Sequence, residues 1–451
     1  MRTIAIIGGG FSGSILAAQL LRRGRTPCRV VLIEKNGRPG PGLAYGTTHV
    51  AHLLNVPAGK MSALAEDPDH FLRWARKSSL QTAADSFLPR RLYGEYISHT
   101  LDEAREYSSL RLEICREQAA SLDERDGQLL VRFDGGGVLE ADFVVLAMGN
   151  YPPSRPFDVE PGAEEHPGFI ADYWSARERR IEPDASILAV GSGLTMVDAV
   201  LELASKKHRG PNCAVSRHGI LPGRHELPFR SYPFFMTPLP DSARALLRLT
   251  RREVEKAEAN GFAWQSVVDS IRPRTNAIWA RLDPAEKERF LRHVRPYWDA
   301  HRHRMPPEIS DAVSRLRDGG GLALKAARVR RVSVSPRKRL RVELSPRSSP
   351  KIEIVDVDCV INCTGPENDL GRTKSPLVAS LLKHWTLLDP LRMGFRVNPD
   401  SGAVVDARGR ESKRLFALGS LRRGTLWETT AVPELREQVR RTADDLLALS
   451  A

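Results

Sequence analysis

A chain of 451 residues is long enough for two or three domains with hydrophobic cores of their own. The net charge is +13, but the basic residues are spread along the chain without a run of about five or six or an aromatic-interleaved stripe, so we expect no nucleic-acid partner. No run of about 20 apolar residues could span a bilayer, and no opening stretch resembles a signal peptide, so we expect a cytoplasmic protein without a membrane span.

The first 34 residues predict half of a dinucleotide-binding unit. Residues 4–7 form an apolar run typical of a buried strand, residues 14–23 favour a helix, and residues 30–33 form a second apolar strand.

The turn between the first strand and the helix carries the glycine pattern of a nucleotide site. Gly8, Gly10 and Gly13 fit G-x-G-x-x-G, in which the glycines allow a tight turn, a close approach to a pyrophosphate and close packing of helix on strand. The helix N-terminus would offer N–H groups to the phosphates. Glu34 stands at the end of the second strand, where an acid binds a ribose diol.

A glycine-rich loop at residues 37–63 follows, too long for a simple connector and well placed to cradle a large cofactor. Helices are expected at 67–77 and 91–106. An antiparallel meander is expected over 111–138.

The same plan repeats in the middle of the chain. A strand at 187–190 leads into Gly191 and Gly193, but Met196 occupies the third glycine position and should set the helix farther from the strand. A second repeat is an Asp seven residues before a glycine, at Asp142 and Gly149 and again seven before Gly365, at Asp358. One chain therefore carries two nucleotide-binding units.

The second unit is interrupted by an insertion at about 224–307, which could be a lid, a substrate pocket or a structural appendage. Near the C-terminus, a short strand runs into Gly419, and Thr430 can cap a helix that has Pro433 in its first turn. This segment is expected to return to the first unit.

The predicted fold class is α/β, with two Rossmann-like dinucleotide-binding domains, β-meanders and a mostly helical insertion. The predicted domains are a first dinucleotide-binding domain over 1–155, completed by 366–451, and a second dinucleotide-binding domain over 156–365 that contains the insertion; the resemblance described below implies FAD for the first and NAD(P) for the second.

Five cysteines occur at scattered positions without a C-x-x-C pair. Cys359 and Cys363 are roughly 13 Å apart at the rise of a strand, too far to bridge, which argues against a dithiol–disulfide reductase. His301 and His303 lack an evident acidic or cysteine partner, so no metal site is predicted and a solvated or phosphate-facing segment is favoured.

These features and the surrounding motifs resemble bacterial FAD/NAD(P)-binding oxidoreductases. Such proteins are two-dinucleotide-domain flavoproteins of the glutathione-reductase-like architecture, and class B flavin monooxygenases are similar at a greater distance. The motifs that carry the resemblance are IIGGGFSG, GLAYGTTHVAHLLNVPAGKMSA, LPRRLYGEYI, VGSGLTMVDAV, SRHGILP, WDAHRHRMPP, VINCTGP and LGSLRRGTLWETTAVPELREQ.

The resemblance implies FAD in the first unit and NAD(P)H in the second. The expected cofactor-binding residues are Gly8, Gly10, Phe11, Ser12, Gly13, Glu34, Lys35, Gly42, Tyr45, His52, Asn55, Met61, Ser62, Gly149, Gly419 and Thr430, together with Gly191, Ser192, Gly193, Leu194, Thr195, Arg217 and Gly365.

Arg217 follows the second strand of the nicotinamide unit, where a cation suits a 2′-phosphate, so NADPH is predicted over NADH. The alternative is a solvated loop arginine. Related flavoproteins often have an acid after the C-terminal glycine, whereas this chain has Ser420. The helix that begins near Val432 is expected to direct its N-terminus at the N1–C2=O2 edge of the flavin.

With both cofactors bound, the shared first step is hydride transfer from nicotinamide to flavin N5. The favoured prediction is a monooxygenase that acts on a small organic substrate through a flavin C4a-hydroperoxide. A reductase or dehydrogenase with an organic or quinone-like acceptor, and a flavin-bound redox sensor or scaffold, are the alternatives. Asn55, Lys60 and Glu428 are the catalytic candidates. The oligomeric state is left open, a homodimer being one option.

Overall fold

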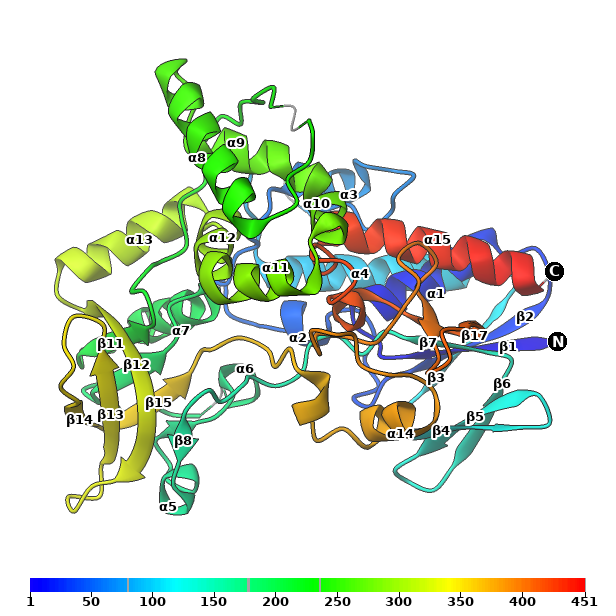
Figure 1. The fold of residues 1–451 in the computed structure, drawn as a ribbon. Helices are drawn as coiled ribbons and strands as arrows, with labels where there is room; N and C mark the ends of the chain where they lie inside the picture. Colours follow the sequence, from blue (N-terminus) through cyan, green and yellow to red (C-terminus); the bar gives the residue numbers. More distant parts are fainter. Residues whose placement is uncertain (79–80, 177–178, 235–236, 451) are drawn as a thin grey trace. The chain divides into compact units, whose positions relative to one another are not determined.

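The computed structural model describes residues 1–78, 81–176, 179–234 and 237–450, and the chain divides into two compact units. Unit 1 comprises residues 1–150, 273–285 and 368–451, and unit 2 comprises residues 151–272 and 286–367. Figure 1 shows both built around a sheet flanked by helices. Residues 235 and 236 of the predicted insertion lie outside the described residues.

Unit 1 is organised around a sheet with the strand order β16-β17-β7-β1-β2-β3. The strands β1 (Arg2–Ile7), β2 (Cys28–Ile33) and β7 (Phe143–Leu146) are parallel, and the apolar runs that predicted the first two are buried in the sheet. The remaining bounds up to β7 are α1 (Phe11–Arg23), α2 (Gly42–Tyr45), η1 (Ala58–Lys60), α3 (His70–Ser78), α4 (Arg90–Glu106), β3 (Arg111–Cys115), β4 (Ala119–Arg125), β5 (Gln128–Phe133) and β6 (Val138–Ala141).

The C-terminal segment, residues 368–451, belongs to unit 1. Strand β17 (Glu411–Ala417) lies parallel to β7, with Leu415 opposite Val144, and β16 (Ala403–Val405) closes that edge. Helix α15 (Val432–Ser450) lies beside α1 in Figure 1, and both contribute to one hydrophobic core. The other C-terminal elements are η4 (Leu370–Arg372), α14 (Pro376–His384) and η5 (Gly419–Arg422).

The meander predicted over 111–138 is confirmed only from residue 119, where β4, β5 and β6 form a separate antiparallel sheet; the prediction is wrong for β3, which pairs parallel to β2 in the main sheet. Helix α14 packs on β4, where the Trp385 indole donates a hydrogen bond of 2.8 Å to the Leu122 carbonyl. The meander is thus held by a helix from the far end of the chain.

The sheet of unit 2 has the strand order β14-β13-β12-β11-β10-β15-β9, with β8 beside β12. The strands from β12 to β9 are parallel, whereas β12, β13 and β14 pair antiparallel. The strands are β8 (Asp158–Val159), β9 (Phe169–Ile170), β10 (Ile187–Val190), β11 (Asn212–Ser216), β12 (Leu322–Val334), β13 (Leu340–Pro346), β14 (Glu353–Val357) and β15 (Cys359–Asn362). The helices that accompany the first strands are α5 (Pro161–Glu164), α6 (Tyr173–Ala176) and α7 (Leu194–Ser205).

The repeated Asp has the same structural task in both units. In unit 1, the Asp142 carboxylate accepts a hydrogen bond of 2.7 Å from the Thr3 N–H at the start of β1. In unit 2, the Asp358 carboxylate accepts one of 2.8 Å from the Ser186 N–H, directly before β10. Each carboxylate therefore ties the start of the closing strand to the start of the central strand.

The insertion is mostly helical, as predicted: α8 (Ala243–Ala259), α9 (Trp264–Ile271), η2 (Arg272–Arg274), α10 (Thr275–Arg281), α11 (Pro284–Arg289), a π-helix (Phe290–Val294), α12 (Arg295–Arg302) and, just beyond the predicted limit, α13 (Pro307–Asp318). The π-helix separates α11 from α12, and Pro296, which lacks an N–H, lies in the first turn of α12. The sequence assigned the whole insertion to the NAD(P)-binding domain, whereas residues 273–285 belong to unit 1.

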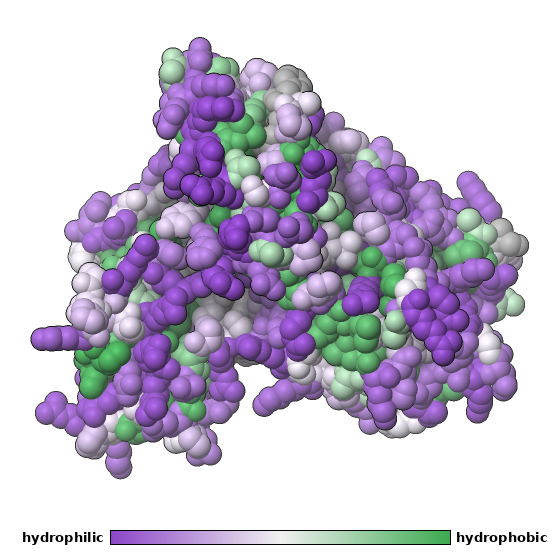
Figure 2. All heavy atoms as spheres, viewed as in Figure 1, coloured by the Kyte–Doolittle hydropathy of each residue, from purple (hydrophilic) through white to green (hydrophobic). Residues whose placement is uncertain are grey.

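Polar and charged residues cover much of the face drawn in Figure 2. Within the described residues, no helix is both long enough and apolar enough to cross a bilayer.

Candidate cofactor sites

The glycine turn of unit 1 has the geometry that its spacing predicted. Gly8 has a φ of +107°, and a Cβ there would lie 2.4 Å from the Ala147 carbonyl oxygen. A Cβ on Gly13 would lie 1.9 Å from the Gly8 carbonyl oxygen, so only glycine lets α1 cross the turn this closely.

The N-terminus of α1 is left open for an anion. Its N-cap is Gly10, which has no side chain to cap the helix, so the first N–H groups remain available for phosphate oxygens. The loop that follows β2 packs directly on this turn: the Gly40 N–H donates to the Gly9 carbonyl at 2.8 Å, and a Cβ on Gly42 would lie 2.9 Å from the Gly10 Cα. These residues fit the pyrophosphate of FAD.

Glu34 lies against the turn. Its Oε2 accepts a hydrogen bond of 2.9 Å from the Gly9 N–H, and its Oε1 accepts one of 3.0 Å from the Asn36 N–H. A carboxylate has further lone pairs for a ribose diol, and ribose binding by Glu34 stays a prediction. Lys35 is exposed beside it.

The predicted flavin loop contains both buried and accessible residues. His52, Met61 and Ser62 are buried; the His52 Nδ1 lies 2.6 Å from the Thr47 hydroxyl, and the Ser62 hydroxyl donates to the Asp67 carbonyl at 2.6 Å. These contacts give His52 and Ser62 structural roles. Asn55 is half-buried and Lys60 is exposed, so both side chains are more accessible than those of His52, Met61 and Ser62.

Two aromatic residues of the predicted set pack on the same core tyrosine, Tyr93. The Phe11 ring lies stacked at a centroid distance of 6.2 Å, and the Tyr45 ring meets it edge-on at 4.7 Å. Burial raises the pKa of Tyr45 to about 12. Phe11 is a core residue, so any contact that it makes with FAD would come from its backbone, as for Ser12 in the same turn.

The C-terminal turn completes the edge of the sheet where β1, β7 and β17 end. Gly149 and Gly419 have φ of +67° and +65°, and the Ser420 hydroxyl donates to the Gly149 carbonyl. Ser420 therefore connects two strand ends. A Cβ on Gly419 would lie 3.8 Å from the Ser12 hydroxyl, so this turn adjoins the FAD glycine turn.

The predicted cap at Thr430 is wrong, because α15 begins at Val432 and the residue before it is Ala431. The residue that organises this segment is Thr429, which is fully buried. Its hydroxyl donates to the Gly419 carbonyl at 3.1 Å and accepts from Gln438 at 2.8 Å, while the Gln438 carbonyl oxygen accepts from the Gly419 N–H at 3.1 Å. The sequence signal for this network is Gln438, a polar residue on the apolar face of the predicted helix.

Unit 2 reproduces the turn geometry. Gly191 has a φ of +113°, and a Cβ there would lie 2.3 Å from the Cys363 carbonyl oxygen. Gly193 is the N-cap of α7, and a Cβ there would meet nothing within 4 Å, which leaves room for a phosphate. The Ser192 hydroxyl lies 2.8 Å from that of Ser216 and donates to the Ile220 carbonyl at 2.6 Å. These residues fit a nicotinamide dinucleotide.

The other predicted residues of the nicotinamide site lie next to this turn. Leu194 and Thr195 are half-buried in the first turn of α7, and Gly365, with a φ of +82°, has open space around its Cβ position. Met196 is fully buried in the core of unit 2, and its effect on helix spacing stays a prediction.

An arginine cluster lies where β11 ends. Arg217 follows Ser216, and Ser216 pairs with Ala326 of β12, so Arg328 lies two residues further along the neighbouring strand. Burial and the positive charges of Arg328 and Arg295 lower the pKa of Arg217. Within the described residues, Arg217 and Arg328 have no acidic partner.

Arg217 and Arg328 are a favourable environment for a bound anion, because guanidinium groups without acidic partners attract phosphate, whereas Arg295 is paired with Asp299 at 3.3 Å. Arg328 and Arg295 were not predicted from the sequence. Over one hundred residues separate Arg217 from Arg328, and no motif connects them.

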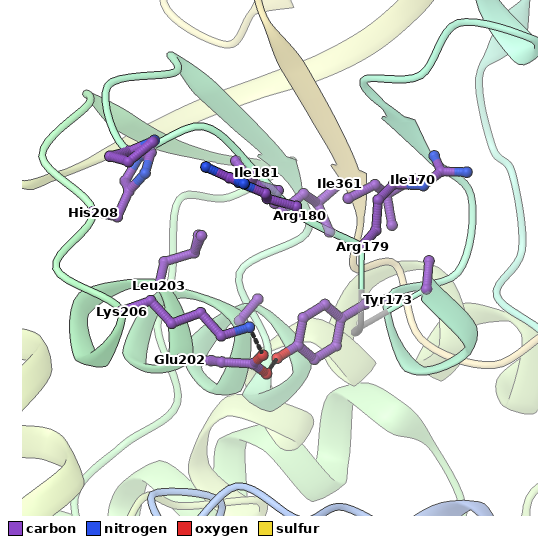
Figure 3. A pocket seen from close by; sticks show the side chains of 13 residues that line it. Ile170, Tyr173, Arg179, Arg180, Ile181, Glu202, Leu203, Lys206, His208 and Ile361 are labelled. Carbon is purple, nitrogen blue, oxygen red and sulfur yellow. Dashed lines mark hydrogen bonds and ion pairs between the residues drawn. The ribbon is translucent and has the colours of Figure 1, made fainter.

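Unit 2 also contains a cavity of about 260 Å³ that is separate from the glycine turn. Figure 3 shows Glu202 between Tyr173 and Lys206; Lys206 Nζ lies 2.6 Å from Glu202 Oε1, and the Tyr173 hydroxyl donates to Glu202 Oε2. Burial raises the pKa of Tyr173, and the hydrogen bond to Glu202 raises it further. None of the predicted site residues lines this cavity, which lies at the opposite end of α7 from Gly193.

Cys359, Cys363 and the pair His301 and His303 were considered in the sequence as redox or metal-binding candidates, and the structure shows their surroundings. Cys359 and Cys363 are buried and unbridged, and burial raises the pKa of Cys359 to about 12 and that of Cys363 further. His301 Nδ1 lies 2.7 Å from the Tyr297 carbonyl oxygen, and His303 Nε2 lies 3.9 Å from the Asp299 carboxylate.

A family model described as FAD-NAD(P)-binding matches residues 5–151. No curated protein matches the chain.

Solved structures share the fold along the entire chain. The ornithine N-hydroxylase of Kutzneria sp. 744 has a TM-score of 0.68 at 14% identity, with 100% of both chains covered. The L-lysine 6-monooxygenase of Pseudomonas syringae has a TM-score of 0.62 at 16% identity, with 100% of both chains covered. Thioredoxin reductase of Lactococcus lactis has a TM-score of 0.52 at 9% identity, with 100% of this chain and 99% of that chain covered.

These similarities confirm three predictions. Residues 5–151 match an FAD-NAD(P)-binding domain, the fold class is α/β with Rossmann-like units, and the fold of the chain is shared with the solved N-hydroxylase, monooxygenase and thioredoxin reductase structures named above.

Proposed function

We propose that this protein is an FAD- and NADPH-dependent monooxygenase that acts on a small organic substrate, with a primary amine as the leading substrate class. The observation that carries the proposal is the presence of two glycine turns whose helices lack a side-chain cap, in a structure whose described residues contain no reactive cysteine pair. The thiolate is the reactive form of cysteine, and burial raises the pKa of Cys359 and Cys363, which disfavours a dithiol mechanism.

The similarity to N-hydroxylating monooxygenases over the entire chain supports amine hydroxylation. The two proteins named above are an ornithine N-hydroxylase and an L-lysine 6-monooxygenase, whose names indicate amine-bearing amino-acid substrates. The similarity lies in the fold, so the identity of the substrate rests on experiment.

The arginine cluster supports NADPH as the reductant. Arg217 would contact the 2′-phosphate, while Arg328 and Arg295 add positive charge to the same place. Ser192 and Ser216, joined by their hydroxyl groups, would hold the turn at the pyrophosphate.

In unit 1, the α1 N-terminus would bind the FAD pyrophosphate and Glu34 its adenosine ribose. Bound FAD would supply hydride acceptance and oxygen activation. Asn55, Lys60 and Glu428 are the candidate residues for substrate or proton contacts; among them Glu428 is buried, which favours a fixed orientation of its carboxylate.

The test is a balanced turnover measurement on the purified, FAD-loaded protein. With NADPH and L-ornithine or L-lysine in separate reactions, a monooxygenase consumes one NADPH, one proton and one O2 for each hydroxylated product, with one water released. Product, O2, NADPH and H2O2 are measured together, with an amine-free reaction as the control. We expect amine-dependent product that accounts for the O2 consumed, and higher kcat/KM with NADPH than with NADH.

Three results would contradict parts of the proposal. If every tested amine yields only H2O2 while a quinone accepts the electrons, the protein is a reductase with an organic acceptor. If NADPH does not reduce the bound flavin at all, a redox-sensing or scaffold role replaces catalysis. Equal kcat/KM for NADH and NADPH would contradict the role given to Arg217.

A further inference from the structure

The segment at residues 273–285 lies within the insertion in sequence but belongs to unit 1 in the fold. Its helix α10 forms close contacts with residues 424–428, which precede helix α15. Because both segments lie in unit 1, these contacts are internal to the FAD-binding unit.

Asn276 binds the backbone of Glu428 at both polar groups. The Asn276 Nδ2 donates a hydrogen bond of 2.9 Å to the Glu428 carbonyl, and the Glu428 N–H donates one of 2.9 Å to the Asn276 Oδ1. A carboxamide that satisfies both the N–H and the C=O of one residue fixes the two peptide groups on either side of that residue.

Trp279, one helical turn further on, binds the same segment. Its indole N–H donates a hydrogen bond of 2.9 Å to the Gly424 carbonyl, and its ring lies 4.9 Å from that of Trp427. Trp279 is 2% exposed and Trp427 5% exposed, so the two rings form a dry contact. The Arg423 guanidinium lies over the Trp427 ring at 5.2 Å.

The segment that α10 holds continues into the FAD turn. Thr429 follows Glu428 and donates to the Gly419 carbonyl, and Gly419 adjoins Ser12 of the glycine turn. A displacement of Glu428 would therefore move Thr429, whose hydroxyl joins Gly419 to Gln438 of α15.

We propose that Asn276 is a positioning residue of the FAD site, which acts through the Glu428 backbone to fix residues 427–429 and the start of α15 relative to the flavin. The role of α10 in the insertion is then to complete unit 1. This proposal rests on the FAD binding of the proposed function and is independent of the fate of the electrons.

The experiment compares the wild-type protein with Asn276→Ala, Asn276→Asp, Trp279→Phe and Arg281→Ala. Arg281 is an exposed residue of the same helix, so Arg281→Ala is the matched control. Asn276→Asp keeps the acceptor for the Glu428 N–H and loses the donor, while Trp279→Phe keeps an aromatic ring and loses the N–H. Three properties are measured: amide hydrogen exchange at residues 424–431, the FAD dissociation constant, and the midpoint potential of bound FAD.

We expect Asn276→Ala to increase exchange at the Glu428 amide at least tenfold, to weaken FAD binding about tenfold through the loss of two hydrogen bonds, and to shift the midpoint potential. Asn276→Asp should give smaller changes at the Glu428 amide, Trp279→Phe should increase exchange within 424–428, and Arg281→Ala should match the wild type. If Asn276→Ala does not fold, the other two variants carry the test.

The proposal is overturned if the Glu428 amide exchanges at the wild-type rate in the folded Asn276 variants, or if FAD affinity and potential stay unchanged while exchange increases. The two proposals can fail separately. If the protein binds FAD and the variants show the expected changes in hydrogen exchange and midpoint potential, but no amine is hydroxylated, the monooxygenase proposal is wrong and the role of Asn276 is still supported.

Discussion

At the scale of single residues, substitutions of Gly10 and Gly13 should affect FAD binding and protein stability to different degrees. Gly10 has an ordinary φ of −73°, and a Cβ there would lie 3.7 Å from the Gly42 Cα, whereas a Cβ on Gly13 would collide with the Gly8 carbonyl oxygen. Gly10→Ala should thus keep the fold and weaken FAD binding by about tenfold, because the extra methyl group interferes with close approach of the pyrophosphate.

Gly13→Ala should instead lower the stability of unit 1 by about 1–3 kcal/mol, the usual cost of overpacking, in addition to weakening FAD binding. Thermal unfolding of the apoprotein and fluorescence titration with FAD measure the two effects. Gly162→Ala is the control, since a Cβ there meets only Val334 at an ordinary 3.9 Å. A Gly13→Ala protein as stable as the wild type would show that the helix and strand can separate at no cost.

At the scale of secondary-structure elements, Asp358 joins β15 to the start of β10. Its carboxylate accepts hydrogen bonds from the Ser186 N–H and hydroxyl at 2.8 and 2.7 Å and from Arg339 Nε at 2.8 Å. Burial alone would raise the pKa of Asp358, but the contacts with Ser186 and Arg339 outweigh it and lower the pKa below the ordinary 3.8.

Asp358→Asn should lower stability at pH 7 by about 1 kcal/mol, a figure reduced for solvent screening because the side chain is 43% exposed. The folded-state pKa lies below the unfolded one, so the ionised carboxylate stabilises the fold above the unfolded-state value and loses this effect as pH falls through the folded-state value. The difference from wild type should therefore shrink below about pH 4. Urea unfolding at several pH values measures it.

Asp126→Asn is the matched control for this change, because the Asp126 side chain is 94% exposed and its nearest ion-pair contact is a weak one of 3.9 Å with Arg125. A difference between Asp358→Asn and wild type that stays constant down to pH 2 would mean that the charge of Asp358 does not contribute.

The strand–turn–helix elements were predictable because their signals are consecutive in the chain. Gly8 to Gly13 and the Asp-to-Gly spacing each lie within a few residues, so the pattern alone identified them. Ser420 meets Gly149 across 271 residues and Asn276 meets Glu428 across 152, and neither contact leaves a periodic trace in the sequence. The start of α15 at Val432 was predicted, but its cap was wrongly assigned to Thr430, because threonine suits a helix N-terminus and nothing in the sequence shows that the neighbouring Thr429 bonds back to the preceding turn.

At the scale of the whole molecule, the two units are interleaved in sequence. The family model ends at residue 151, yet unit 1 also needs β17 beside β7 and α15 beside α1. A fragment of residues 1–155 should therefore expose the edge of β7 and one face of α1, and should neither unfold cooperatively nor bind FAD.

Coexpression of residues 368–451 with that fragment should recover part of the FAD binding, because it restores β17 and α15. Near-UV circular dichroism and FAD titration of the fragment, with and without its complement, check this. The intact chain is the reference. Full FAD affinity in the fragment alone would mean that the C-terminal segment is dispensable.

The membership of residues 273–285 in unit 1 also governs how this chain can be recombined with relatives. A chimera that exchanges residues 151–367 as one block would bring a foreign α10 against the native Gly424–Glu428 segment, and would lose the Asn276 and Trp279 contacts unless the donor supplies the same pair. Clean exchange of the nicotinamide unit requires two additional breakpoints, on either side of α10. Although unit 2 residues flank α10 in the sequence, we expect substitutions in this helix to affect the FAD-binding unit rather than the nicotinamide unit.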